Sequence, residues 1–348
     1  MRLVEKQAFE TLMFREAADS GRVVAEQLRL NRPLAEALGQ RLRDVAPTAA
    51  LICGRGSSDH AGVFARHLIE TGAGLLTSSA APSVASVYAT AQNMRGVVCI
   101  AVSQSGKSPD LLASVAAARG GGAFVIAVVN VEDSPLARAA DAVVPVRAGP
   151  EHSVAATKSF IASLTALAQI IGHWLEDEAL LAALETLPDR LEEAWALDWS
   201  AALHTLREAR DLYVVGRGPG YGAAREAALK LKETSGLHAE AFSAAEIRHG
   251  PMALVKSGFP VLVLPQDDES RDDTLSLAAE FAGRGAKVLL ADVSPAPGTT
   301  ALPALSAHPA VQPILLIQSF YRLAAELAVA RGYDPDRPPY LNKVTETV

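Results

Sequence analysis

Residues 48–58 read TAALICGRGSS, an apolar run that ends in Gly-Arg-Gly, and residues 211–220, DLYVVGRGPG, repeat that pattern. The glycines that open the two turns, Gly54 and Gly216, lie 162 positions apart. Two further pairs of apolar runs end in polar residues at the same spacing, Gln104 with Gln266 and Asn130 with Asp292. Three anchors at one offset predict two similar halves; the alternative is that all α/β units resemble one another.

The apolar runs alternate with helical patterns, which is typical of parallel sheets covered by helices on both faces. Aromatic residues make up only 5% of the chain, and Ala, Val and Leu favour buried parallel strands between alanine-rich helices. We therefore predict an α/β chain of two tandem three-layer sandwiches, each a mostly parallel, flavodoxin-like or Rossmann-like sheet flanked by helices. The expected parts are an N-terminal helical segment at 1–34, a first domain at 35–185, a second domain at 198–333 and a tail at 334–348.

Four stretches outside the apolar runs have helical patterns. Proline at a first turn and glycine after a last turn mark helix ends, and proline inside a helix breaks it. On these grounds we expect a helix at 108–122 with Ser108 as N-cap, one long helix at 153–184, a helix at 220–237 that ends near Gly236, and two helices within 1–45 that are split at Pro33.

Composition excludes several classes of partner. The chain of 348 residues has a net charge of −7 and no lysine/arginine run, which argues against nucleic acid. No uninterrupted apolar run approaches the roughly 18 residues of a membrane helix, and the start lacks an apolar signal core, so we expect a cytoplasmic protein without a membrane partner. Cys53 and Cys99 lie in strand-like runs, without a neighbouring Cys or His at zinc spacing. We expect buried, reduced thiols and no metal.

A polar turn follows the apolar run at 99–102, and it reads SQSGKS at 103–108. Gly106, Lys107 and Ser108 match the end of a P-loop, but Ala101 stands where its first glycine belongs. The turn is also too short to wrap a triphosphate. Hydroxyl groups and free N–H groups at a helix start suit a single phosphate monoester better.

The first Gly-Arg-Gly turn adds Ser57 and Ser58 at the start of another helix. Ligands of such sheets lie at the carboxyl ends of the strands, so both turns could reach one phosphate. The alternative is that the serines only cap helices. In the second half Asp267, Asp268 and Glu269 follow the equivalent run and would repel a phosphate. We therefore expect only the first half to bind phosphate.

The densest polar stretch lies at 229–255. Glu233, His238, Glu240, Glu246 and His249 fall within 17 residues there. Glu233 ends a helix, where a carboxylate is poorly placed for the helix dipole. No metal-ligand spacing is present. Acid–base chemistry by one carboxylate and one imidazole is one interpretation; salt bridges to Lys232 and Arg248 are the structural alternative.

Four stretches carry a family resemblance, from about Met13 to the C-terminus and in order. They are VSQSGKSPDLL, SVAATKSFIASLTAL, EAALKLKETSGLHAEAFSAAEIRHGPMAL and the tail YLNKVTETV. They resemble the isomerase half of glutamine–fructose-6-phosphate amidotransferase, a pair of sugar isomerase (SIS) domains. The glutaminase half begins with a catalytic cysteine, whereas this chain begins Met-Arg-Leu, so we expect no glutaminase here. The expected relatives are stand-alone aminosugar-phosphate deaminases and isomerases.

The resemblance implies a role for each site residue. Glu233 would move the proton between C1 and C2, and Lys343, on a tail that acts as a lid, would form a Schiff base with the ketose. His249 would assist ring opening and reach the site of a neighbouring subunit, which implies a homodimer with shared sites. Asn342 departs from the family's alanine, which allows a different substrate preference. The residues implied to bind the sugar phosphate are Ser57, Ser58, Ser103, Gln104, Ser105 and Ser108, with the backbone near Val154.

The implied activity is conversion of glucosamine 6-phosphate to fructose 6-phosphate and ammonia, with no metal or organic cofactor. Proton transfer in the open-chain form gives an enolamine and then an imine, which water hydrolyses. A fructosamine-6-phosphate deglycase or a galactosamine-6-phosphate deaminase would use the same phosphate site. A non-catalytic sugar-phosphate sensor is the alternative of another class, but it has no need of Glu233, His249 and Lys343 together.

Overall fold

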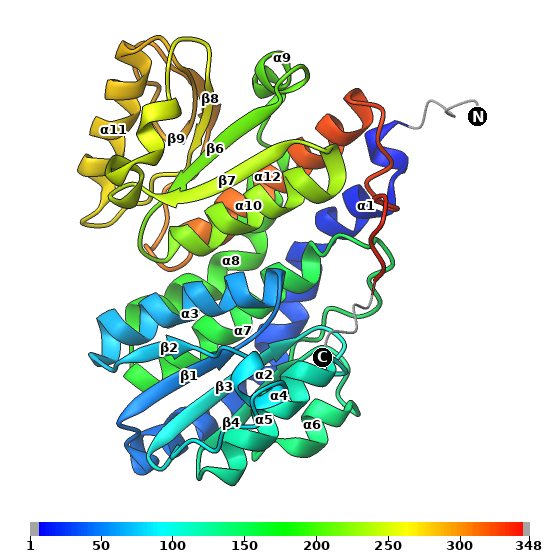
Figure 1. Cartoon of the computed structure of the whole chain (residues 1–348), viewed down its shortest axis with the longest axis vertical. Coiled ribbons are helices and arrows are strands. Elements are labelled where there is room, and N and C mark those ends of the chain that lie inside the picture. Colours follow the sequence, from blue (N-terminus) through cyan, green and yellow to red (C-terminus); the bar gives the residue numbers. More distant parts are fainter. Residues whose placement is uncertain (1–6, 344–348) are drawn as a thin grey trace. The chain divides into compact units, whose positions relative to one another are not determined.

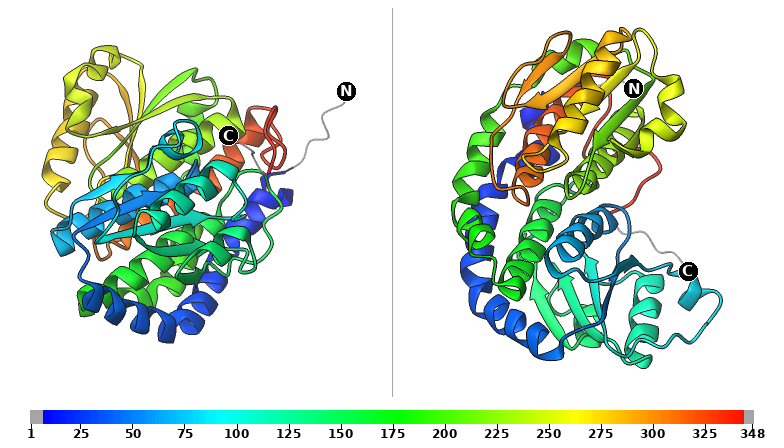
Figure 2. Two further views of the ribbon diagram at one scale, coloured as in Figure 1. Left: turned by 60° about the horizontal axis from the view of Figure 1, so that its bottom comes forward. Right: turned by 90° about the vertical axis from the view of Figure 1, so that its left-hand side faces the viewer.

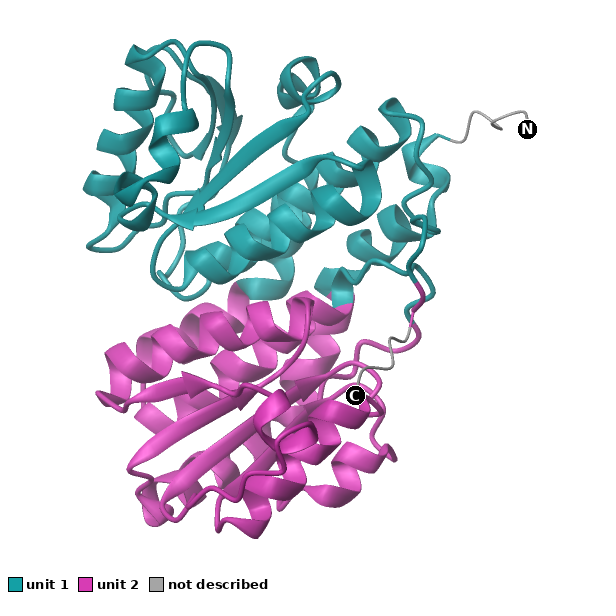
Figure 3. Cartoon of the chain, in the orientation of Figure 1, with its two compact units in different colours: residues 1–21, 151–158, 187–341 teal, residues 22–150, 159–186, 342–348 magenta. Residues whose placement is uncertain are grey.

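The computed structural model describes residues 7–343 and divides the chain into two compact units (Figure 3). Unit 1 comprises Met1–Gly21, Glu151–Lys158 and Leu187–Leu341, and unit 2 comprises Arg22–Pro150, Ser159–Thr186 and Asn342–Val348. Each unit contains one five-stranded sheet whose described pairings are all parallel. The prediction of an α/β chain with two helix-flanked parallel sheets is confirmed.

The sheet of unit 2 has the strand order β2-β1-β3-β4-β5. Its strands are Thr77–Ser79, Ala49–Cys53, Val97–Ser103, Phe124–Val129 and Ala142–Pro145, in that order. One face packs on α5 (Pro109–Gly120) and α6 (Pro135–Ala139), where valine and alanine side chains form a buried cluster. Helix α3 (Ser57–Ala73) covers the other face so closely that a Cβ on Gly62 would lie 2.6 Å from Ile52. The carboxyl ends of β1 and β3 therefore meet the starts of α3 and α5.

The sheet of unit 1 has the order β10-β9-β8-β6-β7, the same topology read from the other end. Its strands are Thr300–Pro303, Lys287–Asp292, Pro260–Val263, Asp211–Gly216 and His238–Ser243. Helix α11 (Arg271–Gly283) packs on one face with Phe281 and Leu277, and α10 (Gly220–Ser235) lies against β6 and β7 (Figures 1 and 2). Strands β6, β8 and β9 correspond to β1, β3 and β4, so the two-half prediction is confirmed.

The remaining helices frame these sheets. In unit 1 a buried helix, α12 (Gln312–Ala330), packs on α10 and α1. It is long and apolar enough to cross a membrane by length and composition, but 78% of its most apolar window is buried within the protein. The others are α1 (Leu12–Ala18), α2 (Ser20–Val45), α4 (Ser83–Ser86), α7 (Lys158–Leu175), α8 (Glu178–Ala196) and α9 (Leu203–Leu206), with short 3-10 turns η1 (Ala8–Glu10), η2 (Ser200–Ala202), η3 (Glu246–His249) and η4 (Pro251–Leu254).

Two helix predictions were wrong. The N-terminal break falls at Asp19, and Pro33 lies inside the continuous helix α2. Pro33 is exposed, while Asn31 and Ala35 beside it are buried, so tertiary packing outweighs the cost of the lost N–H group. The long helix expected at 153–184 begins only at Lys158 and is interrupted at Glu176, whose φ of 55° ends α7 before α8 begins.

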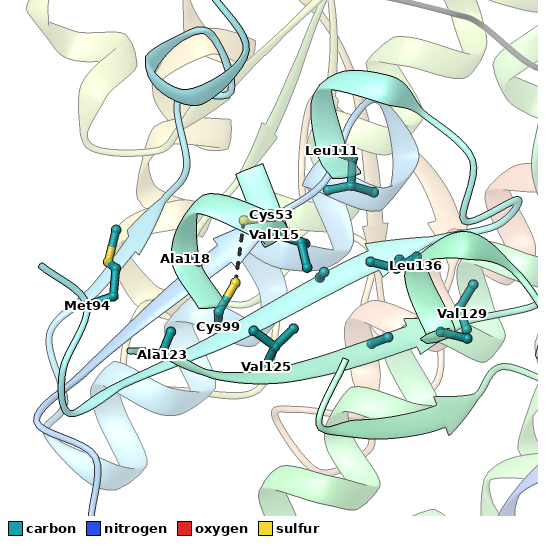
Figure 4. Packing of buried hydrophobic residues seen from close by; sticks show 13 residues of the cluster. Cys53, Met94, Cys99, Leu111, Val115, Ala118, Ala123, Val125, Val129 and Leu136 are labelled. Atoms are coloured by element: carbon teal, nitrogen blue, oxygen red, sulfur yellow. Dashed lines mark hydrogen bonds between the residues drawn. The ribbon is translucent and has the colours of Figure 1, made fainter. Parts of the chain in front are cut away.

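The two cysteines lie on the neighbouring strands β1 and β3 (Figure 4). Both are free and fully buried, with their sulfur atoms 3.7 Å apart. The thiol of Cys99 and burial raise the pKa of Cys53 well above its usual value, which disfavours the reactive thiolate. The pair therefore packs as small apolar side chains, as the sequence predicted.

Candidate functional site

A cavity of about 590 Å³ opens at the carboxyl edge of the sheet in unit 2; we call it the phosphate pocket. It lies where β1 and β3 deliver the chain to the starts of α3 and α5. None of its described lining residues is acidic. They are Arg55, Gly56, Ser58, Val102, Ser103, Gln104, Ser105, Ser108, Leu111 and Lys343. Two helix starts, a set of hydroxyl groups and two cationic side chains give this pocket the chemistry of an anion site.

The serine hydroxyl groups of the polar turn are oriented by its backbone. Ser103 accepts the N–H of Gly106 at 3.0 Å, and Ser105 accepts that of Lys107 at 3.4 Å. A hydroxyl that accepts a bond still has its own proton to donate. Ser108 occupies the N-cap position of α5, yet its side chain makes no capping hydrogen bond. For Ser108, the helix-cap alternative therefore fails.

Gly106 shapes the turn because no other residue fits there. Its φ is +64°, and a Cβ would lie 2.2 Å from the hydroxyl oxygen of Ser134. Lys107, the lysine of the apparent P-loop match, is exposed and lies outside the lining set. The structure thus agrees with the sequence argument against a nucleotide loop.

Arg55 was missed by the sequence analysis. Its guanidinium binds Asp110 Oδ2 through Nε at 2.8 Å and through Nη2 at 2.6 Å, and the Asp110 side chain is only 1% exposed. This bond ties the first turn to α5 and fixes the guanidinium at the pocket wall. The arginine between the two glycines was the available signal. Gly56, Val102 and Leu111 are further lining residues that were not singled out.

Of the residues predicted to bind phosphate, Ser58, Ser103, Gln104, Ser105 and Ser108 line the pocket. Ser57 begins α3 between two lining residues and is not itself among them. Lys343 also lines the pocket, although it lies 235 positions beyond Ser108 in the chain. The structure therefore brings the predicted lysine of the tail to the predicted serines.

Glu233 lies in unit 1, in the last turn of α10, with its side chain 20% exposed. It is hydrogen-bonded to the ammonium group of Lys230, which is 1% exposed and also lies 3.4 Å from Glu226 Oε1. The hydroxyl of Tyr321, on α12, donates to the same Glu226 oxygen at 3.2 Å. We call these four residues the charged cluster. Glu233 lies at the accessible end of the charged cluster, whereas Glu226 is fully buried.

The charges of the cluster are interdependent. Burial opposes the charge of Lys230, but Glu226 and Glu233 outweigh it and raise the pKa of Lys230 above its usual value. Burial and the nearby Glu226 raise the pKa of Tyr321 well above its usual value. Lys230 is therefore a cation and Tyr321 a neutral donor at neutral pH. Glu233 thus presents its carboxylate, paired with a buried cation, at the accessible end of the cluster, and a carboxylate is one of the groups that act as a general base.

Two other predicted residues lie in unit 1, outside the charged cluster. His249 is exposed at the end of η3. Val154 is half-buried, and its N–H donates to the carbonyl of Asp336 at 3.3 Å. A sugar contact by the Val154 backbone would therefore use its carbonyl oxygen. No group of three or more His, Cys, Asp or Glu side chains is placed to hold a metal within residues 7–343.

The equivalent edge of the sheet in unit 1 is closed by its own side chains. The amide oxygen of Gln266 accepts the N–H of Gly220, at the start of α10, at 2.7 Å, and its amide nitrogen binds Asp268. Asp267 pairs with Arg271 at 2.8 Å. The N–H group that would face an anion is thus already used. That only the first half binds phosphate stays a prediction.

Comparison with known proteins identifies the family. The SIS domain family matches residues 47–172 and 205–294, one match in each half. The chain belongs to the SIS domain family. It is 40% identical over 313 residues to glutamine–fructose-6-phosphate aminotransferase of Aeropyrum pernix, a match that covers 84% of this chain and 50% of that protein. The chain is homologous to the isomerase half of such enzymes, as predicted.

Two solved structures share the fold of this chain. A proposed phosphosugar isomerase from Silicibacter pomeroyi is 37% identical, with a TM-score of 0.89 over 94% of this chain and 100% of that one. Glucosamine-6-phosphate deaminase from Thermotoga maritima is 23% identical, with a TM-score of 0.77 over 97% of this chain and 100% of that one. At 23% identity, the similarity to this second structure shows a shared fold and no more.

Proposed function

We propose that this SIS protein converts glucosamine 6-phosphate to fructose 6-phosphate and ammonia. The observation that carries the proposal is the phosphate pocket, in which oriented hydroxyl groups and two cations converge without an acidic lining residue. The isomerase half of the aminotransferases, to which the chain is homologous, supports a phosphosugar and an aldose–ketose reaction. We also propose that the protein acts in the cytoplasm.

The proposed chemistry needs one base and water. His249 assists opening of the pyranose, and Glu233 removes the proton from C2 of the open-chain amino aldose. The electron pair forms the C1–C2 double bond of an enolamine while the C1 oxygen takes up a proton from water. Glu233 then returns its proton to C1 as the nitrogen releases one to water. The C2 imine that results is hydrolysed, so that water supplies the ketone oxygen and ammonia leaves.

Two residues complete the proposal. Lys343 acts on the ketose side, where its amine adds to the C2 carbonyl and the carbonyl oxygen leaves as water; the resulting Schiff base is hydrolysed again to release the ketose. Its place in the lining of the phosphate pocket supports this role. His249 serves the site of a partner subunit in a homodimer. Its exposure in the single chain supports that role, because a side chain that completes a partner's site has to be accessible before the subunits associate.

The experiment that tests the proposal compares ammonia release from glucosamine 6-phosphate by the wild type and by Glu233→Gln. We expect release by the wild type and a fall of about a hundredfold to ten-thousandfold in kcat in the variant, because a general base contributes that much. Binding of fructose 6-phosphate should be unchanged. Glu240→Gln is the matched control, because Glu240 is an exposed carboxylate on β7 outside the charged cluster.

Other outcomes distinguish the alternatives. Release from galactosamine 6-phosphate or a fructosamine 6-phosphate, but not from glucosamine 6-phosphate, would change the substrate and keep the mechanism. Equal activity of the wild type and Glu233→Gln would remove Glu233 from the base role. Tight binding of sugar phosphates without turnover of any of them would replace the enzyme with a sensor.

A further inference from the structure

A second cavity, of about 300 Å³, opens in unit 1. It lies at the amino ends of β6 and β7, beside the loop that leads into β8, and we call it the amino-edge cavity. Its polar lining residues are Asp211, Tyr213, His238, Glu240 and Lys256. The proposed chemistry uses none of them, so this cavity calls for an explanation of its own.

Four of the five polar residues form two rungs of the β6–β7 pair, which Figure 1 shows side by side. Asp211 is paired with His238, and Tyr213 with Glu240. Because side chains alternate along each strand, these four lie on one face of the sheet. The first rung is satisfied internally, since Asp211 Oδ1 and His238 Nδ1 lie 3.2 Å apart. The second rung contains no such bond.

Tyr213 carries a hydroxyl group that has no hydrogen-bond partner in the described part of the chain. The residue is 6% exposed, and its ring makes edge-on contacts with Phe242 and Phe259 at centroid distances of 4.9 Å. A buried tyrosine hydroxyl ordinarily finds a partner. Over residues 7–343, the fully enclosed polar side-chain atoms without a partner are amide oxygens, so the Tyr213 hydroxyl borders open space, which is that of the cavity. Burial, Glu240 and Asp211 raise the pKa of Tyr213, so the hydroxyl keeps its proton and can donate or accept.

Two charged groups of opposite sign line the same cavity without pairing. Neither the Glu240 carboxylate nor the Lys256 ammonium makes a hydrogen bond or an ion pair with a described residue. Lys232 acts on Glu240 only at longer range, because its own ammonium donates to the carbonyl of Ala239 at 3.0 Å. The cavity therefore offers a free anion and a free cation to one small molecule.

The balance of charge narrows the class of ligand. Asp211 and Glu240 bring two negative charges to the lining, and Lys256 brings one positive charge. This excess of negative charge opposes a phosphate dianion, and Lys256 opposes a simple cation. A molecule with one ammonium and one carboxylate group satisfies both ends. Leu254, which is 60% exposed, and Phe259 add an apolar wall.

We propose that the amino-edge cavity binds a free α-amino acid with an apolar side chain. Glu240 and the hydroxyl oxygen of Tyr213 accept hydrogen bonds from the ammonium group, and Lys256 binds the carboxylate. Leu254 and Phe259 cover the side chain of the ligand. The proposal goes beyond the proposed function and does not depend on it.

The test begins with calorimetry on the full chain. The probes are L-leucine, L-methionine and L-phenylalanine. Two analogues of leucine each lack one charge: 3-methylbutylamine has no carboxylate, and 4-methylpentanoate has no ammonium group. We expect leucine to bind about tenfold or more tightly than either analogue, because each analogue loses a charge-assisted contact.

Variants of the two charged residues should each affect one end of the ligand. Lys256→Met should weaken leucine binding about tenfold and should not weaken 3-methylbutylamine binding. Glu240→Gln should weaken leucine binding about tenfold and should not weaken 4-methylpentanoate binding. Lys287→Met is the matched control, because Lys287 is an exposed lysine at the start of β9, on the same edge of the sheet and outside the described lining. It should bind leucine as the wild type does.

Tyr213→Phe removes the hydroxyl and keeps the ring. We expect leucine binding to weaken about threefold to tenfold, which is the loss of one hydrogen bond, while the midpoint of urea unfolding stays unchanged. A lower midpoint would show that the hydroxyl is bonded within the fold and would overturn the assignment of Tyr213.

Three further results would overturn the proposal. They are no binding of any of the three amino acids, binding that none of the cavity variants weakens, and equal affinity for leucine and its two analogues. Glucosamine 6-phosphate is measured in a chain with Ser105→Asp, which places a carboxylate in the phosphate pocket. Binding there that depends on both Glu240 and Lys256 would assign the cavity to an amino sugar phosphate instead. Failure of the wild type to release ammonia would overturn the proposed function alone.

Discussion

Helices α3 and α10 occupy the same place in the two halves but carry different buried side chains. Each follows a Gly-Arg-Gly turn, and each ends at a left-handed glycine, Gly74 in unit 2 and Gly236 in unit 1. These glycines keep the 162-residue offset of the strands. Three positions on one stripe of the helix differ: Phe64, Leu68 and Thr71 in α3 correspond to Glu226, Lys230 and Glu233 in α10.

The two stripes have the same spacing and opposite chemistry. Phe64 is fully buried and Leu68 is 9% exposed, so they act as ordinary core residues. Glu226 and Lys230 are equally buried, and their mutual pairing, the Glu233 carboxylate beside Lys230 and the Tyr321 hydroxyl offset the cost of burying charge. A fold that tolerates an apolar stripe at this position has no structural need for the charged one. Under the proposed function, the charged cluster serves the chemistry of Glu233.

The carboxyl edges of the two sheets also differ, because the edge in unit 2 lines a pocket and the edge in unit 1 is occupied by its own side chains. Gln104 lines an open pocket, whereas Gln266 is buried and bonded to Gly220 and Asp268. The arginines of the two turns are alike, since Arg55 pairs with Asp110 and Arg217 with Asp273. Asp110 lies in the first turn of α5, after β3, and Asp273 in the first turn of α11, after β8. Unit 2 thus has an open edge and an apolar helix, and unit 1 has a closed edge and a charged helix.

The largest expected effect comes from breaking the charged cluster. Lys230→Met leaves Glu226 buried without its cation, so we expect the free energy of unfolding to fall by about 3–5 kcal/mol. Glu226→Leu together with Lys230→Met, which makes α10 resemble α3, should recover most of that loss without restoring activity. Urea unfolding measures both variants. A Lys230→Met chain as stable as the wild type would show that the cluster is not energetically coupled.

The same variant has a pH dependence of defined sign. Because the pKa of Lys230 is raised in the folded chain, its contribution to stability is complete below the unfolded value of about 10.4 and is lost as the pH rises through the folded pKa. The stability difference between wild type and Lys230→Met should therefore be constant near neutral pH and shrink above about pH 10.4. A difference that grows there would contradict the assignment.

A smaller effect is expected when a residue of the unit 1 edge is placed at the matching position of the unit 2 edge. Ser105 corresponds to Asp267 at the common offset, so Ser105→Asp gives the open edge the acid of the closed one. We expect the affinity for fructose 6-phosphate to fall by about a hundredfold or more, because like charges in contact cost several kcal/mol. Ser105→Asn, of the same size and without charge, should lose far less. Calorimetry measures both, and equal losses would attribute the effect to shape.

Most of this comparison could be read from the sequence. The repeat, the phosphate turn and the acidic second edge follow from local chemistry and a fixed offset, and the family resemblance supplied Lys343. Arg55 was missed because a turn arginine is ordinarily a solvated residue, and only the packing of α5 shows that its partner is buried Asp110. The helix break predicted at Pro33 was wrong because the exposure of Pro33 and the burial of its neighbours depend on tertiary packing, which the local sequence does not show.

The smallest expected effect comes from replacing the two corresponding glutamines, Gln104 and Gln266, one at a time. Gln266→Ala removes the acceptor of the Gly220 N–H and leaves a buried donor unpaired, so we expect a loss of about 1–3 kcal/mol in the free energy of unfolding. Fructose 6-phosphate binding should stay unchanged. Gln104→Ala should do the reverse, since Gln104 lines the phosphate pocket and is only partly buried. Thermal unfolding and calorimetry on both variants give a two-by-two comparison. If Gln266→Ala weakened binding as much as Gln104→Ala, the closed edge would also take part in ligand recognition, and the division of work between the two halves would be wrong.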